Sequence, residues 1–233
     1  MFLRAYRGAL AVIAKKPITL WGLSLLSVII TFFATVFTAP VFCIGFIVSI
    51  LINCGMAKVY IDGLCGKEVN SDQLFAAFNG NCLRVVGGML WRTLWIFIWM
   101  LVPIVGPIVA IVKSYSYSFV PYILMTKPEV TATQALRLSM QMTNGIKGSM
   151  FLADLCFIGG AVAIILVLAL FAMIPIIGVL FGLVLAVFVI LYLLFATIFQ
   201  GLYWAYFYMD AQRPNRRVYR EPQYIEDEEC YED

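Results

Sequence analysis

The sequence predicts an all-α membrane protein in which six transmembrane helices form three hairpins, with amphipathic helices on the cytoplasmic face. Hydrophobic residues make up 63% of the 233 residues and charged residues only 12%, whereas soluble domains carry about 25% charged residues. Apolar runs of about 20 residues, long enough to cross a bilayer, recur along the chain. Runs such as 151–174 and 176–199 have no polar face to turn toward water, which argues against a soluble helical protein.

The first expected element is a basic amphipathic helix over residues 1–16, lying at a membrane surface. Its cations are Arg4, Arg7, Lys15 and Lys16. Pro17 is expected to end this helix. A cleavable signal peptide is the alternative, but the apolar run at 18–38 is too long for a typical signal.

A membrane domain is expected over residues 17–209. Its six spans cover about residues 17–38, 41–60, 84–102, 108–125, 149–173 and 179–209. In the loops, Asn70 is a candidate cap for a short helix, and Thr131 with Gln134 matches a capping box for another. Residues 210–233 form a tail that is first basic and then acidic.

The distribution of Lys and Arg sets the expected orientation. Of the 16 cations, 14 lie in the N-terminal segment, the tail and the long loops at 57–84 and 126–148. The three proline-bearing turns contain none, so the positive-inside rule places both termini and both long loops in the cytoplasm. The residues expected to face anionic lipid are Arg4, Arg7, Lys15, Lys16, Arg213, Arg216 and Arg217.

The three expected hairpins resemble one another. Each begins with a surface helix, turns at a proline and ends at an aromatic exit, marked by Tyr60, Tyr122 and Tyr208. The aromatic cluster at 203–208 also suits a belt at the membrane interface. A true triplication, with its axis along the membrane normal, and the general likeness of any three hairpins remain alternative interpretations.

The stretch 113–125 places one lysine, Lys113, inside an apolar run, followed by alternating serines and tyrosines that include Tyr115 and Tyr117. A charged amine in hydrocarbon costs about 3 kcal/mol on insertion scales, so Lys113 should face the protein interior or a water-filled cavity. Carbonyl groups freed by the turn at 103–107, or a bound anion, are its expected neighbours.

Four more polar residues fall within expected spans, roughly 8–14 Å from the cytoplasmic ends at a rise of about 1.5 Å per residue. They are Asn53, Arg92, Asp154 and Gln200. Arg92 and Asp154 are expected to pair, because a buried charge requires a partner. Lys113 comes out farther from the cytoplasmic end, at about 20 Å.

These polar groups admit three interpretations. They can join helices by hydrogen bonds, form a site for a substrate or lipid headgroup, or couple protons or ions. The residues of such a site would be Asn53, Arg92, Lys113, Tyr115, Tyr117, Asp154 and Gln200.

Enzyme chemistry has little support in the sequence. There is no histidine, which removes the commonest general base and metal ligand. The six cysteines include no Cys-x-x-Cys pair, and Asp154 is the lone acid within the expected spans. We therefore expect a non-enzymatic protein without catalytic residues, metal or cofactor.

Residues 108–160 carry a pattern that resembles a known family. It runs from Lys113-x-Tyr115-Ser-Tyr117 through Pro121-Tyr-Ile-Leu to Leu152-x-Asp154-Leu-x-Phe-Ile-Gly159. The pattern is similar to bacterial integral-membrane proteins known as domain of unknown function nine-seven-five. That family is distantly similar to the membrane domain of some glycerophosphodiester phosphodiesterases. The resemblance implies a fold and a bacterial plasma-membrane location, without an assigned activity.

The leading functional hypothesis is a self-associating, membrane-organising or lipid-binding scaffold in the plasma membrane. Its expected partners are anionic lipids of the cytoplasmic leaflet, with a homo-oligomer as an open option and no nucleic acid. The alternative is a transporter or flippase-like carrier of a lipid or small anionic solute. A cavity that reaches Lys113 would favour transport, and a dry bundle with contacts between copies would favour the scaffold.

Overall fold

The computed structural model describes residues 2–15, 17–37, 42–79, 82–103, 105–172, 174 and 178–212. Within these residues the secondary structure is helical and includes no strand. Five segments are long and apolar enough to cross a membrane, judged by length and composition: Pro17–Val36, Ile44–Leu64, Cys82–Met100, Gly106–Thr126 and Lys147–Phe171. The sixth expected span falls in the long helix at Gly178–Gln212. The apolar segment in this helix, Leu180–Val189, is shorter than the five segments named above and is not one of the candidate spans.

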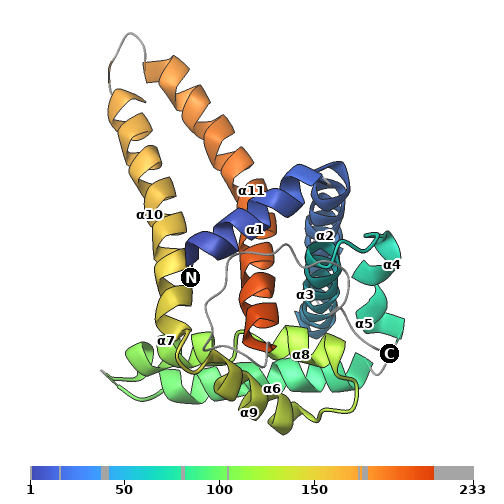
Figure 1. Ribbon diagram of the computed structural model, residues 1–233. Coiled ribbons are helices and arrows are strands. Elements are labelled where there is room, and N and C mark those ends of the chain that lie inside the picture. The colour runs from blue at the N-terminus through green and yellow to red at the C-terminus, as the bar shows by residue number, and fades with distance from the viewer. Residues whose placement is uncertain are drawn as a thin grey trace.

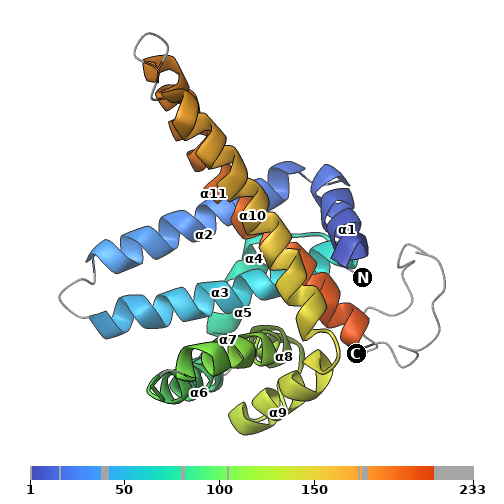
Figure 2. The same ribbon diagram turned by 90° about the vertical axis from the view of Figure 1, so that its left-hand side faces the viewer.

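Consecutive long helices pack side by side in pairs, as Figure 1 shows. The pairs are α2 (Pro17–Phe37) with α3 (Phe42–Leu64), α6 (Cys82–Met100) with α7 (Gly106–Ser116), and α10 (Lys147–Ala172) with α11 (Gly178–Gln212). The three pairs meet at one end and diverge toward their turns (Figure 2). The side chains near the turns therefore have few neighbours from the other pairs.

Shorter helices complete the end at which the three pairs meet, and we refer to this end as the base. They are α1 (Phe2–Lys15), α4 (Ser71–Leu74), α5 (Ala76–Asn79), α8 (Val120–Thr126) and α9 (Ala132–Thr143). α1 packs across α11 and α10, α9 packs on α6 and α8, and α4 and α5 pack on α3. The base thus joins all three pairs.

The hydrophobic core lies in the base. Its largest fully buried side chains include Tyr203, Phe207 and Tyr208 of α11 and Phe119 before α8. The expectation of an interface belt at 203–208 is therefore wrong for these three residues. They are fully buried in the base, where α1, α3 and α10 pack on α11 and where Phe119 and Tyr122 contact Tyr208. In contrast, the long helices carry many exposed Leu, Ile, Val and Phe side chains, which suit contact with lipid.

The fourth expected span is broken into α7 and α8 between Ser116 and Val120. Pro121 has no amide hydrogen for the carbonyl of Tyr117, and its ring would clash with that carbonyl in a continuous helix. The hydroxyl of Ser139 on α9 donates to the carbonyl of Ser116 at 2.8 Å. This carbonyl at the end of α7 therefore has a hydrogen-bond partner despite the break.

The helix ends agree with the expectations in most places. α1 ends at Lys15 and α2 begins at Pro17, where a proline is well tolerated. The capping box of α9 is confirmed, since Thr131 and Gln134 exchange side-chain and backbone hydrogen bonds. α4 begins after Asn70, but the Asn70 side chain makes no capping hydrogen bond.

Several expected features lie outside the described residues. They are Lys16, the turns at 38–41 and 175–177, and the tail with Arg213, Arg216 and Arg217.

Candidate functional site

Asp154 of α10 is buried, with 5% of its surface exposed. Its carboxylate accepts hydrogen bonds from the hydroxyl of Tyr115 at 2.7 Å, from the indole Nε1 of Trp204 at 3.2 Å and from the hydroxyl of Tyr203. No cation forms an ion pair with it among the described residues. Three neutral donors therefore satisfy this buried charge and tie α7, α10 and α11 together.

α1 is anchored beside this carboxylate by Tyr6. The hydroxyl of Tyr6 donates to the carbonyl of Ala153, and its ring centroid lies 5.0 Å from that of Phe199 and 5.5 Å from that of Tyr203. Burial, with smaller effects of Cys156 and Asp154, raises the pKa of Tyr6 to about 12. The side chain therefore remains a hydrogen-bond donor throughout the neutral pH range.

The expected pair between Arg92 and Asp154 does not form. α10 packs mainly on α11, α1 and α7, whereas α6, which carries Arg92, packs on α3, α7, α8 and α9. Arg92 instead lines a partly open cavity of about 610 Å³. Its Nε atom is buried and has no hydrogen-bond partner in the described part of the chain. No carboxylate is among the described residues that line this cavity.

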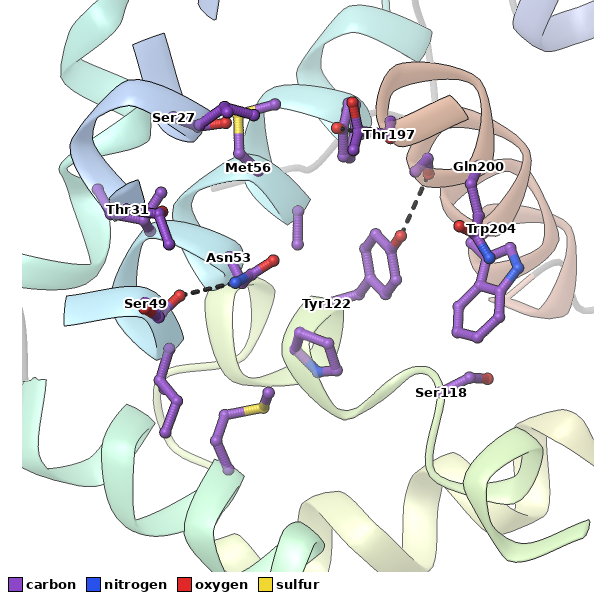
Figure 3. A pocket seen from close by; sticks show the side chains of 18 of the residues that line it. Ser27, Thr31, Ser49, Asn53, Met56, Ser118, Tyr122, Thr197, Gln200 and Trp204 are labelled. Carbon is purple, nitrogen blue, oxygen red and sulfur yellow. Dashed lines mark hydrogen bonds between the residues drawn. The ribbon is translucent and has the colours of Figure 1, made fainter. Parts of the chain in front are cut away.

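The cavity brings three of the predicted site residues together from different helix pairs. Asn53 of α3 and Gln200 of α11 line it together with Arg92 of α6. In Figure 3, Asn53 and Gln200 lie on either side of Tyr122, and the amide of Asn53 donates to the carbonyl of Ser49. These three predicted residues therefore share one site, whereas Asp154 belongs to a separate cluster.

Two tyrosines tie the cavity wall to α11. The hydroxyl of Tyr60 donates to the carbonyl of Thr197 at 3.0 Å. The hydroxyl of Tyr122 donates to the carbonyl of Gly201 at 3.2 Å (Figure 3). Neither tyrosine was among the predicted site residues. Their recurrence at the ends of two expected hairpins was the available signal.

Trp204 is the residue that the two polar clusters share. It lines the cavity, and its indole nitrogen donates to Asp154. Thr197, Gln200 and Trp204 lie on one face of α11, because they are three and four residues apart. This spacing can be read from the sequence. From the sequence, Trp204 was predicted only as part of the aromatic cluster at 203–208.

Lys113 lies apart from the cavity. Its Nζ atom is 5.5 Å from the centroid of the Trp99 ring, a cation–π arrangement. An aromatic ring therefore takes the place of the expected carbonyl neighbours. Of the other predicted residues nearby, Tyr115 binds Asp154 and Tyr117 is buried in the core of the base.

The fold defines a class of protein, an all-helical chain with several helices that suit a multi-pass membrane protein. Compared with protein-family models, curated proteins and solved structures, the chain has no significant match. The resemblance of residues 108–160 to a bacterial membrane family therefore stays a prediction.

Proposed function

We propose that the chain is a bacterial plasma-membrane protein that binds anionic lipid at its cytoplasmic face and organises the membrane around it. In this proposal α11 is the sixth span, the three helix pairs are membrane hairpins, and the base faces the cytoplasm. The positions of the cations in the sequence support this orientation. The protein is a scaffold, and its diverging helix pairs offer apolar flanks to lipid or to further copies of the chain.

The geometry of α1 carries the proposal. Ala5 and Ala9 are fully buried where α1 packs on α10 and α11, and Tyr6 fixes the helix as described above. The opposite side exposes apolar Leu3 and Leu10 together with three cations. These cations are Arg4, Arg7 and Lys15. A helix held flat on a membrane domain, with apolar and cationic residues exposed, suits the surface of an anionic leaflet.

The test is lipid selection by the whole protein. Protein in bilayers of mixed phosphatidylcholine and phosphatidylglycerol is extracted with its surrounding lipid, and the extracted ratio is compared with that of the bulk bilayer. Each cation near an anionic surface contributes about 1 kcal/mol. The triple variant Arg4→Gln, Arg7→Gln, Lys15→Gln should therefore lose most of the enrichment in phosphatidylglycerol.

The matched control neutralises exposed cations away from α1, with Lys67→Gln and Arg137→Gln. This control should keep the enrichment of the parent protein. Equal enrichment in the parent and the α1 variant would contradict the proposal.

The cavity favours a second candidate function, a carrier of an anionic lipid or small anionic solute. It opens between three helix pairs and contains a cation with no partner in the described residues. Transfer of a fluorescent anionic lipid between the leaflets of reconstituted vesicles distinguishes the two functions, because a scaffold should not accelerate it.

A further inference from the structure

We infer that the cavity beside Arg92 binds the phosphate or carboxylate head of a single anionic amphiphile. The inference rests on the proposed placement of the helix pairs in a membrane, and it is independent of the proposed role of α1. The ligand would be one specific molecule held between the helix pairs, distinct from the lipid that surrounds the protein.

The charge of the site favours an anion. Arg92 lines the cavity, and its Nε is buried without an acceptor among the described residues. The described residues that line the cavity include no carboxylate. Asp154, the partner of Arg92 predicted from the sequence, accepts three hydrogen bonds in a separate cluster. A cation placed in a low-dielectric region without a counter-ion is strongly disfavoured. A bound anion supplies the missing counter-ion.

The remaining polar groups of the cavity can donate hydrogen bonds to that anion. The carboxamide of Gln200 makes no side-chain hydrogen bond with a described residue, so both of its N–H groups are available. The amide of Asn53 donates one N–H to the carbonyl of Ser49 and keeps a second. The site therefore combines one cation with neutral donors, which suits a phosphate or a carboxylate.

The size and lining of the cavity favour an amphiphile over a free ion. A volume of about 610 Å³ falls in the range of pockets for drug-sized ligands. Apolar side chains make up much of the wall, including Val28, Phe46, Ile50 and Met89. A hydrocarbon chain can lie against these residues while the charged head contacts Arg92.

The depth of Arg92 separates this site from the ordinary headgroup layer. Arg92 lies two helical turns beyond Arg84 along α6, a distance of about 12 Å from the base end. Lipids bound at the membrane surface by α1 would not reach this position. The ligand head would therefore be drawn below the plane of the surrounding headgroups.

The experiment is native mass spectrometry of the whole protein released from nanodiscs of phosphatidylglycerol or of phosphatidylcholine. The parent protein should retain one tightly bound phosphatidylglycerol and no phosphatidylcholine. Arg92→Met should weaken retention about tenfold or more, the loss expected for a charge-assisted contact. Arg137→Met removes an exposed cation outside the cavity and should retain the lipid as the parent does. Equal retention by Arg92→Met and the parent would overturn the inference.

Two further variants keep the test decisive if Arg92→Met does not fold. Gln200→Leu and Asn53→Leu keep the cationic residue and remove neutral donors, and each should reduce retention severalfold. A parent-like amount of bound lipid in both variants would also overturn the inference.

A second arm distinguishes the source of the anion. Inorganic phosphate is added to the detergent-solubilised protein, and its melting temperature is compared with that in phosphatidylglycerol. Phosphatidylglycerol should raise the melting temperature of the parent but not of Arg92→Met, and phosphate alone should leave it unchanged. Equal stabilisation by phosphate would show that the site binds a free anion, and it would overturn the assignment of an amphiphile as the ligand.

The failure of this inference can be separated from failure of the proposed function. The α1 triple variant should lose bulk enrichment of phosphatidylglycerol and still retain the single lipid at Arg92. Loss of the single lipid in Arg92→Met, with the lipid retained in the α1 triple variant, assigns it to the cavity.

Discussion

At the residue scale, the two charged residues inside the apolar helices have opposite surroundings. The carboxylate of Asp154 accepts hydrogen bonds from two tyrosine hydroxyls and an indole. Arg92 instead faces a cavity, and its Nε has no hydrogen-bond partner among the described residues. The sequence identified both residues as unusual, since charges inside apolar helices are rare. It could not tell which charge has partners within the protein, because this depends on the angles at which the helices cross.

The Asp154 cluster is predicted to stabilise the base. Asp154→Ala leaves the hydroxyls of Tyr115 and Tyr203 and the indole of Trp204 without their acceptor, and each orphaned donor costs about 1–3 kcal/mol. The variant should therefore melt well below the parent protein in the same detergent. Asp210→Ala, an acid on α11 outside the cluster, is the matched control and should have a smaller effect. Equal melting temperatures for Asp154→Ala and the parent would contradict this role.

A second residue-scale prediction concerns Gly201. A Cβ atom at this position would overlap the ring of Tyr60, which packs directly on the backbone of α11. Gly201→Ala should therefore destabilise the protein by about 1–3 kcal/mol, a typical cost of overpacking.

Gly182→Ala provides the control on the same helix, because nothing lies within 4 Å of a Cβ there. The cost of Gly201→Ala should fall when Tyr60 is also changed to alanine. If Gly201→Ala and Gly182→Ala have the same melting temperature, the packing of Tyr60 described here is wrong.

At the element scale, the sequence predicted the presence of the helices better than their breaks and partners. The capping box at Thr131 was readable because its two members lie three residues apart. The break before Pro121 had a local signal, yet the apolar run around it suggested one continuous span. The burial of Tyr203 had no local signal, because the covering helix α1 lies almost 200 residues earlier in the chain.

Arg84 makes a contact between elements that the sequence did not reveal. From the sequence it was predicted only to be one of the cations of the loop at 57–84. It lies in α6 and donates to the carbonyls of Leu124 at 2.6 Å, Val130 at 3.0 Å and Lys127 at 3.3 Å. Its guanidinium thus caps the end of α8 and holds the following loop.

Arg84→Met is predicted to loosen this connection. Loss of a charged donor to carbonyls costs about 1.5–3 kcal/mol, so amide hydrogen exchange should accelerate across residues 125–131. Arg84→Lys should restore little, because an ammonium group cannot reproduce the spread of the guanidinium. Arg137→Met serves as the matched control. Unchanged amide hydrogen exchange in Arg84→Met would show that the contacts of Arg84 do not stabilise this loop.

At the scale of the whole molecule, the fold separates a packed base from diverging apolar helix pairs (Figure 2). Hydropathy predicted the all-helical class and most of the long apolar helices, because length and composition decide whether a helix can cross a bilayer. It could not predict the divergence of the pairs, and therefore could not predict the cavity. That cavity depends on contacts between residues far apart in sequence.

The central claim is that the turn ends of all three helix pairs lie on the outer side of the membrane and the base on the cytoplasmic side. Single cysteines are introduced at Val36, Val102 and Ile174 near the turns, and at Lys67 and Thr133 in the base. The background lacks the native cysteines and retains the melting temperature of the parent. Intact cells are then treated with a maleimide that cannot cross membranes. The account predicts labelling at all three turn positions, and labelling at the two base positions only after the cells are permeabilised. Labelling of Lys67→Cys or Thr133→Cys in intact cells, or protection of any turn position until permeabilisation, would contradict it.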